Sequence, residues 1–296
     1  MDIVPHFHIY LIAERRVAQN TFAAYKKDLE QLCEYLASKN IALHEAKPVD
    51  LKGFIEHLVD KKITRRSVAR KISCVKLFYN YASERHAWTN YASQLVFPVL
   101  EKRLPKFLNE EQVDTLLATA AADSSIYGIR NKVMIFLLYG TGMRISELVS
   151  LKKQQIRWDV QNILVYGKGG KDRTIPLPEA IAPMLKDYIT QIHPKITKKT
   201  TTDWLFPISY KKEYQPMSRQ SFWSLLKKMA LKSGSPSWIS PHIIRHSFAT
   251  HLLARGVNLR ALQLLLGHES IDTVQIYTHV PTSFVRKVYD KKHPRS

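Results

Sequence analysis

The sequence predicts a mainly α protein of two domains: an all-helical N-terminal domain and a mixed, mostly helical C-terminal domain with one small antiparallel sheet. Three observations support this fold class. The chain has 296 residues, which suits two domains of ordinary size. Apolar residues recur at steps of three and four along most of it, as in amphipathic helices. One stretch has two short apolar runs around a glycine-rich turn, as in paired strands.

The N-terminal domain is expected over residues 1–88, with helices beginning near Asn20, after Asp50 and after Thr64. Each of these segments places its apolar residues on one stripe. The helix after Thr64 also carries a basic stripe on its other face, which is either a solvated surface or a contact to DNA phosphates. The basic residues proposed to bind DNA there are Arg65, Arg66, Arg70 and Lys71.

A linker is expected over residues 89–106, where helical periodicity is lost and Pro98 and Pro105 occur. The second domain then covers residues 107–296 and includes a C-terminal tail. Its first helix should begin after Asn109, a favourable N-cap residue.

Paired strands are expected at 162–166 and 172–177, joined by the turn G-K-G-G-K. After them the pattern is helical again, and no further sheet is expected. The expected helix starts are near Glu179, Ser218, Ser240, Asn258 and Ile271.

The charge of the chain favours a polyanionic partner, because 45 Lys and Arg against 25 Asp and Glu leave a formal charge of +20. Nucleic acid and an anionic membrane surface both fit this charge. No apolar run approaches the roughly 20 residues of a membrane span, and the N-terminus does not resemble a signal peptide. We therefore expect a cytoplasmic protein. Cys33 and Cys74 lie among apolar helical residues and are expected to be buried thiols.

Four segments place cationic or titratable side chains among small or apolar neighbours. They are T-G-M-R-I-S-E-L (141–148), Y-G-K-G-G-K-D-R (166–173), P-H-I-I-R-H (241–246) and L-L-G-H through I-Y-T-H (265–279). Taken singly, each has an ordinary structural explanation. Arg144, for example, could simply pair with Glu147 across one helical turn. His242 and Arg245 are more informative, because their spacing places an imidazole and a guanidinium on one helical face.

Familiar cofactor and metal motifs do not fit these segments. A phosphate-binding P-loop needs Gly-Lys-Ser/Thr before a helix, whereas Lys171 precedes Asp172 and a strand. His242 and His246 have zinc-helix spacing, but no Glu lies between them and Arg245 would be beside the metal. No carboxylate cluster suits magnesium. We therefore expect neither cofactor nor metal, and favour metal-free attack of a tyrosine on a phosphodiester that arginines neutralise.

The combination of these residues resembles the tyrosine recombinases. The match comprises Arg144, Lys168, H-x-x-R at 242–245, G-H at 267–268 and I-Y at 276–277. The segments at 20–29 and 66–79 are similar to the helical core-binding domain of that family. The ending I-Y-T-H-V through H-P-R-S looks most like the Xer branch, which resolves chromosome dimers in bacteria.

The resemblance implies a mechanism in which two domains clamp double-stranded DNA. Arg144 and Arg245 would hold the scissile phosphate, and His268 would donate a further hydrogen bond to it. Tyr277 would attack phosphorus to form a 3′-phosphotyrosyl link, with His242 assisting its deprotonation. Lys168 would protonate the departing 5′-oxygen, with Lys171 and Arg173 as alternatives that also contact DNA.

The resemblance also implies how the DNA site is recognised. The helix from Ser218 would enter a major groove, where Arg219 and Gln220 either contact bases or bind only phosphates. The target would be a short inverted repeat, bound by a homo-oligomer or by a heterotetramer with a paralogous recombinase, and the protein would be nucleoid-associated without a membrane partner.

Three alternative functions share some of these features. An integrase or transposase of a mobile element would use the same chemistry. A type IB topoisomerase would share the arginines, a histidine and the tyrosine but would relax supercoils as a monomer. A noncatalytic DNA-binding protein would need none of the six catalytic residues.

Overall fold

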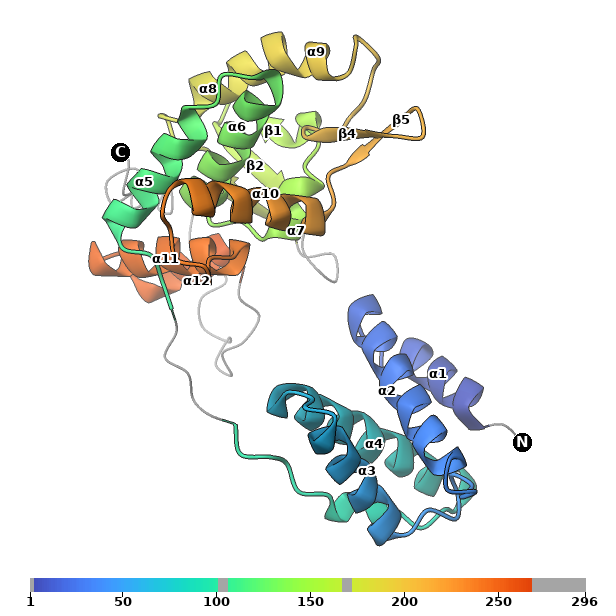
Figure 1. Cartoon of the computed structure of the whole chain (residues 1–296). Helices are drawn as coiled ribbons and strands as arrows, with labels where there is room; N and C mark the ends of the chain where they lie inside the picture. The colour runs from blue at the N-terminus through green and yellow to red at the C-terminus, as the bar shows by residue number, and fades with distance from the viewer. Residues whose placement is uncertain (1–2, 101–105, 167–171, 268–296) are drawn as a thin grey trace. The chain divides into compact units, whose positions relative to one another are not determined.

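The computed structural model describes residues 3–100, 106–166 and 172–267. The chain divides into two compact units, Met1–Leu104 and Pro105–Ser296. The first unit is helical throughout its regular structure, as expected. Its elements are α1 (Ile3–Ala13), α2 (Gln19–Ala37), α3 (Pro48–Asp60), α4 (Arg65–His86) and the 3-10 helix η1 (Tyr91–Gln94) (Figure 1).

The core of the first unit combines aliphatic and aromatic side chains from its four long helices. Phe7, Phe54, Phe78 and Tyr79 are almost completely buried there. Cys74 is also buried, Cys33 is half-buried, and both thiols are free. The expectation of a buried thiol is therefore confirmed for Cys74, whereas Cys33 is only partly buried.

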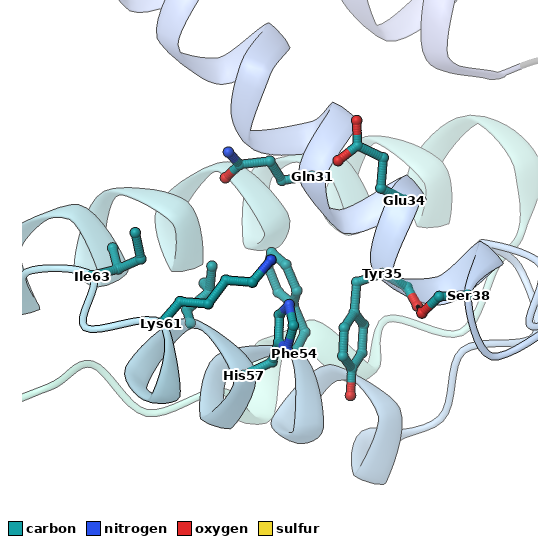
Figure 2. Close-up of a pocket in the computed structure, with 9 residues that line it drawn as sticks. Gln31, Glu34, Tyr35, Ser38, Phe54, His57, Lys61 and Ile63 are labelled. Atoms are coloured by element: carbon teal, nitrogen blue, oxygen red, sulfur yellow. Dashed lines mark hydrogen bonds between the residues drawn. The ribbon is translucent and has the colours of Figure 1, made fainter.

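Helices α2 and α3 approach each other closely around Tyr35 (Figure 2). The Tyr35 hydroxyl lies against Gly53 of α3, where an added Cβ would be only 2.7 Å from the oxygen. His57 and Phe54 face the same tyrosine ring, at centroid distances of 5.1 and 5.5 Å. A side chain at position 53 would therefore displace the Tyr35 hydroxyl from this contact.

Part of the predicted linker packs against the first unit. Asn90 caps η1 by accepting a hydrogen bond from the Ser93 amide, and Ala92 is completely buried. Trp88, Tyr91 and Leu95 pack against the N-terminal core. The segment immediately after α4 therefore extends the first unit, although its sequence lacks helical periodicity.

The second unit is built around α6 (Ile126–Thr141), whose residues are buried on nearly every side. Helix α6 contacts α5 (Glu110–Ala121) and α11 (Pro241–Ala254). The remaining helical elements are α7 (Ile145–Val149), η2 (Lys153–Gln155), α8 (Ala182–Asp187), the π-helical turn η3 (Tyr188–Ile192), α9 (His193–Ile196), α10 (Arg219–Lys232) and α12 (Leu259–Leu266).

Several helix starts were predicted correctly because polar residues cap them. Asn109 and Gln112 form a reciprocal capping box at α5. Ser218, Ser240 and Asn258 each accept a hydrogen bond from a backbone amide of the helix that follows. The expected start near Glu179 is instead at Ala182, and the start near Ile271 lies outside the described residues.

The predicted strand pair is present and belongs to a three-stranded antiparallel sheet in the order β1-β2-β3. The strands are β1 (Ile156–Arg157), β2 (Asn162–Val165) and β3 (Arg173–Pro176). Val165 pairs with Arg173, so these two residues bracket the glycine-rich turn.

The expectation of a single sheet is wrong. A second antiparallel pair is formed by β4 (Pro207–Tyr210) and β5 (Glu213–Pro216). Its turn consists of Lys211 and Lys212, which both adopt positive φ values of 47° and 68°. Hairpin turns of this kind usually contain Asn or Gly, so two lysines gave no recognisable turn signal.

Candidate active site and DNA-binding residues

The T-G-M-R segment turns the chain sharply at the end of α6. Gly142 caps that helix with a φ of 59°, a left-handed conformation that favours glycine. An added Cβ would also lie 2.4 Å from the Phe248 ring. Gly142 is therefore required for both its backbone conformation and its lack of a side chain, and the turn places Arg144 at the N-cap of α7.

Arg245 projects from α11 into the buried region between α6 and α12. Its Nη1 donates to the Gly142 carbonyl and its Nη2 to the Leu266 carbonyl, each at 2.6 Å. Only 7% of the residue is exposed. Burial lowers the pKa of Arg245 to about 10, and the nearby positive charges of Arg144 and Arg173 act in the same direction. The guanidinium remains charged at neutral pH.

Arg144 also reaches the end of α12. Its Nη2 donates to the Gly267 carbonyl at 2.6 Å, next in sequence to the carbonyl that Arg245 uses. Gly267 is the C-cap of α12 and has a φ of 63°. The Arg144 side chain is still 37% exposed. Arg144 and Arg245 thus both donate to backbone carbonyls at the end of α12, and Arg245 also donates to the carbonyl that ends α6.

Glu147 joins Arg144 to Arg173. Its carboxylate accepts from the Arg144 backbone amide at 2.6 Å and from Arg144 Nη1 at 3.0 Å. It also accepts Nη1 and Nη2 of Arg173, both at 2.8 Å. Burial alone would raise the pKa of Glu147, but the hydrogen bonds from the two arginines outweigh burial and the pKa is lowered.

These four residues, Arg144, Glu147, Arg173 and Arg245, form the arginine cluster. Three guanidinium groups against one carboxylate leave an excess of two positive charges. Among the residues that the structure describes, no carboxylate forms an ion pair with Arg245, whose η nitrogens are bound to carbonyls. An uncompensated positive charge at a partly open site is suited to an anion with two or more acceptor oxygens.

Four of the predicted site residues fall outside the described part of the chain: Lys168, Lys171, His268 and Tyr277. In sequence, Lys168 and Lys171 lie between β2 and β3, and His268 follows Gly267 directly.

His242 is exposed on the first turn of α11 and lines an open groove of about 610 Å³. The groove also contains Arg219 and Gln220 from α10 and Ile145 from α7. The structure therefore places one predicted catalytic side chain and two predicted DNA-binding side chains along one groove.

The basic stripe on α4 is only partly as predicted. Arg65 and Arg66 are exposed on the first turn of that helix, after the Thr64 cap. Lys71 is not on this surface, because only 5% of it is exposed and its ammonium donates to Asp28 at 2.7 Å. Arg70 is half-buried and pairs with the other oxygen of Asp28.

The placement of Lys71 on an exposed stripe was wrong for a physical reason. Asp28 on α2 is 1% exposed, so its charge needs cationic partners inside the unit. Lys71 also donates to the Gln31 side chain. Both interactions join α4 to α2. Lys71 is therefore a structural ion-pair partner within the first unit.

Family models match both units. The phage integrase family model matches residues 106–283, and the model of the phage integrase N-terminal SAM-like domain matches residues 4–86. The chain belongs to the phage integrase family of tyrosine recombinases. It is a tyrosine site-specific recombinase enzyme of the XerD-like kind.

Similar recombinases match over nearly the full length. The chain is 37% identical to tyrosine recombinase XerD of Staphylococcus aureus over 296 residues, which cover 99% of each protein. It is 36% identical to tyrosine recombinase XerD of Shewanella oneidensis over 96% of this chain and 94% of that protein.

Solved structures support the fold of the recombinase. XerH recombinase bound to its difH substrate matches with a TM-score of 0.69 and 22% identity, covering 92% of this chain and 80% of that one. The Tn1549 transposon integrase bound to transposon right-end DNA matches with a TM-score of 0.70 and 21% identity, covering 97% of this chain and 98% of that one. At these identities the likeness concerns the fold.

Two further findings apply to the described part of the recombinase. No three His, Cys, Asp or Glu side chains within residues 3–100, 106–166 and 172–267 gather in a way that could hold a metal ion. In the same ranges, no helix has the length and apolar character needed to cross a membrane.

Proposed function

We propose that this recombinase exchanges DNA strands at a short inverted-repeat site and thereby resolves dimers of a circular chromosome or plasmid. Full-length likeness to two XerD recombinases supports this assignment within the family. The observation that carries the chemistry is the arginine cluster, whose two excess positive charges are positioned by backbone carbonyls at the ends of α6 and α12.

The arginine cluster fits the transition state of phosphodiester cleavage. Negative charge increases on the nonbridging oxygens when a nucleophile adds to phosphorus, and fixed cations stabilise that charge without rearrangement. The Arg144 guanidinium is held by the Gly267 carbonyl, and part of its side chain is still exposed. In this proposal Arg144 and Arg245 bind the scissile phosphate, and Glu147 with Arg173 fixes the position of Arg144.

Each of the remaining catalytic residues has one proposed role in the cleavage step. The Tyr277 oxygen forms a bond to phosphorus as the bond to the 5′-oxygen breaks, and His242 assists removal of the phenol proton. Lys168 supplies a proton to the departing 5′-oxygen, and His268 donates a hydrogen bond to the phosphate. Attack by a 5′-hydroxyl of the second duplex reverses the step, so neither ATP nor a metal cofactor is required.

DNA contacts are proposed on both units. Arg65 and Arg66 are exposed on the first turn of α4, where we propose that their positive charges attract DNA phosphates. Arg219 and Gln220 are exposed at the N-terminal end of α10 and available to base edges. Lys171 lies three residues after Lys168 and is proposed as a further phosphate contact. Arg70 and Arg173 contribute positive charge near these surfaces while they are paired with Asp28 and Glu147.

The proposed assembly contains paired DNA sites and several recombinase subunits, either copies of this chain or this chain with a paralogue. Two duplexes must be held together because each cleaved strand is rejoined to the other duplex. The proposed location is the cytoplasm, in association with the nucleoid, where such DNA is found.

Covalent trapping provides the decisive experiment. Randomly nicked genomic fragments are incubated with the recombinase, and DNA that remains attached to protein in detergent is sequenced. We expect one inverted-repeat sequence to be recovered with the native protein in the presence of a chelator, and none with Tyr277→Phe. A plasmid dimer carrying two directly repeated copies should then be converted to monomers through Holliday junctions.

The outcomes separate the alternatives. Covalent capture without sequence preference, together with relaxation of supercoils, would indicate a topoisomerase. Sequence-specific binding without covalent capture would indicate a DNA-binding protein. Recovery of the ends of one mobile element would indicate an integrase.

A further inference from the structure

Trp223 is an exposed aromatic residue on the surface of α10 that carries Arg219 and Gln220. It lies four residues after Arg219 and three after Gln220, so the three side chains are neighbours on one helical surface. The opposite surface of α10 is buried through Phe222, Leu226 and Met229. Trp223 is 41% exposed and lines the same groove as Arg219 and Gln220, so its apolar surface is accessible from that groove.

Lys227 fixes the orientation of this indole. Its ammonium lies over the Trp223 ring, 5.3 Å from the centroid, and donates to the Ser237 carbonyl. Ser237 belongs to the segment between α10 and α11, so the ammonium connects that segment to the indole. One face of the ring is therefore covered, and the ring is held in place before any partner arrives.

The groove in front of Trp223 also contains catalytic and base-recognition residues. Its lining includes His242 at the start of α11 and Arg219 and Gln220 at the start of α10. Backbone amides at the starts of these two helices favour negative charge, as a DNA backbone would supply. Trp223 adds the large apolar surface in a groove whose other side chains are largely polar.

We propose that Trp223 is a specificity-determining residue that contacts the 5-methyl group of a thymine in the recombination site. The inference rests on the proposed function, in which α10 enters the major groove. The thymine methyl is the apolar group that a base pair presents in that groove, and cytosine, adenine and guanine lack it. Arg219 and Gln220 provide hydrogen bonds, so Trp223 extends recognition to a base pair that hydrogen bonds alone distinguish less well.

The test uses the inverted-repeat site recovered by covalent trapping. Each thymine is replaced in turn by deoxyuridine, which removes the methyl group and leaves every hydrogen-bonding group unchanged. Binding of the native recombinase is measured by fluorescence anisotropy at fixed salt. We expect binding to depend on the methyl group of one thymine in each half-site. Replacing that thymine by deoxyuridine should weaken the affinity about fourfold, which is the effect of removing one methyl group from an apolar contact.

Trp223→Ala should bind the thymine and deoxyuridine sites equally, and Trp223→Phe should show an intermediate difference. Trp158→Ala is the matched control, because Trp158 is also 41% exposed but lies in the β1–β2 turn, at the other end of β2 from the glycine-rich turn. This control should retain the full fourfold difference. Thermal melting of each variant verifies that it is folded.

Two outcomes would overturn the role of Trp223. The native protein could be insensitive to deoxyuridine at every position, or Trp223→Ala could retain the same sensitivity as the native protein. A uniform loss of affinity in Trp223→Ala with unchanged deoxyuridine sensitivity would place the indole against the sugar-phosphate backbone instead. Failure of the proposed function is recognised separately, because the native protein would then yield no sequence-specific complex.

Discussion

Glu147 binds Arg173 through two parallel hydrogen bonds of 2.8 Å each while the same carboxylate holds Arg144. A single buried acid therefore keeps two cations close together. Without it, Arg144 and Arg173 would repel each other and Arg245 beside them, so the acid is necessary for the cluster although it does not itself bind phosphate.

Glu147→Gln should destabilise the DNA-free recombinase by roughly 3 to 5 kcal/mol, the usual cost of removing one partner from a buried ion pair. Added DNA should restore more of the melting temperature in this variant than in the native protein, since phosphate supplies the missing negative charge. Thermal melting with and without DNA measures both effects. Glu111→Gln is a suitable control on an exposed residue of α5. Equal melting temperatures of native and Glu147→Gln protein would contradict this role.

The ion pair between Glu147 and Arg173 predicts that the stability of the protein depends on pH. The pKa of Glu147 in the folded protein is lowered from its ordinary 4.5, so the folded state binds fewer protons than the unfolded state just below that value. The contribution of Glu147 to stability is therefore complete above about pH 4.5 and is lost as the pH falls through the lowered pKa. Urea unfolding between pH 6 and 3 should show the difference between native and Glu147→Gln protein shrinking with acid. A constant difference would disprove the linkage.

Gly142→Ala should both destabilise the protein and slow cleavage. The left-handed backbone costs an alanine about 1 to 2 kcal/mol, and its Cβ would press on Phe248, adding about 1 to 3 kcal/mol. Gly234→Ala is the matched control, since Gly234 also has a positive φ of 65° but has open space around a Cβ. It should show the backbone cost alone and form covalent complexes at the native rate. Equal effects of the two substitutions would show that the contact with Phe248 does not matter.

Lys71 and Arg66 should respond in opposite ways to substitution. Lys71→Met should lower the free energy of unfolding by roughly 3 kcal/mol and leave the salt dependence of DNA binding unchanged, because its charge is used on Asp28. Arg66→Ala should change stability by less than about 0.5 kcal/mol and reduce the slope of log affinity against log salt by about 0.9. Binding titrations over a range of salt concentrations, at a temperature where both variants are folded, measure these slopes. A reduced slope for Lys71→Met would return Lys71 to the DNA surface.

Lys168→Ala should be rescued by sulfur chemistry if Lys168 is the general acid. General acid catalysis typically contributes about 100-fold to 10,000-fold, so this variant should cleave ordinary DNA slowly. A substrate with sulfur in place of the 5′-bridging oxygen needs no proton on its leaving group, and Lys168→Ala should cleave it almost as fast as native protein does.

The controls for this experiment are Arg144→Ala, which should remain slow on both substrates, and Lys171→Ala. Arg173 is bound to Glu147 and only 13% of its side chain is exposed, so Arg173→Ala should also remain slow on the sulfur substrate. Rescue of Lys171→Ala instead of Lys168→Ala would assign the proton to Lys171. If the sulfur substrate rescues neither variant, the segment between β2 and β3 positions DNA and does not transfer the proton.

The fold was predictable where local chemistry determines it. Caps at Asn109, Ser218 and Ser240 and the apolar periodicity behind them located helices to within a residue or two. The β4–β5 hairpin was missed because its turn residues are lysines held in an uncommon backbone conformation. The packing of η1 was missed because burial of Ala92 depends on side chains distant in sequence.

The candidate site was predictable from residue types but not from their contacts. Arg144 and Arg245 could be selected from the sequence, and so could the pairing of Arg144 with Glu147 across a helical turn. The bidentate pair between Glu147 and Arg173 could not, because the two residues are 26 positions apart and in different elements. Burial of Lys71 was likewise invisible, since it depends on Asp28 in another helix.

The use of backbone carbonyls at Gly142 and Gly267 has an evolutionary consequence. Carbonyl groups are the same in every residue, so side chains of α6 and α12 outside the two glycine caps can be replaced over time without altering the acceptors that Arg144 and Arg245 bind. Changes of length are not tolerated in the same way. One inserted residue would rotate the end of α12 by about 100° and carry the Gly267 carbonyl away from its arginine. Mutational drift in these helices should therefore proceed by replacement, while insertions and deletions accumulate in loops elsewhere.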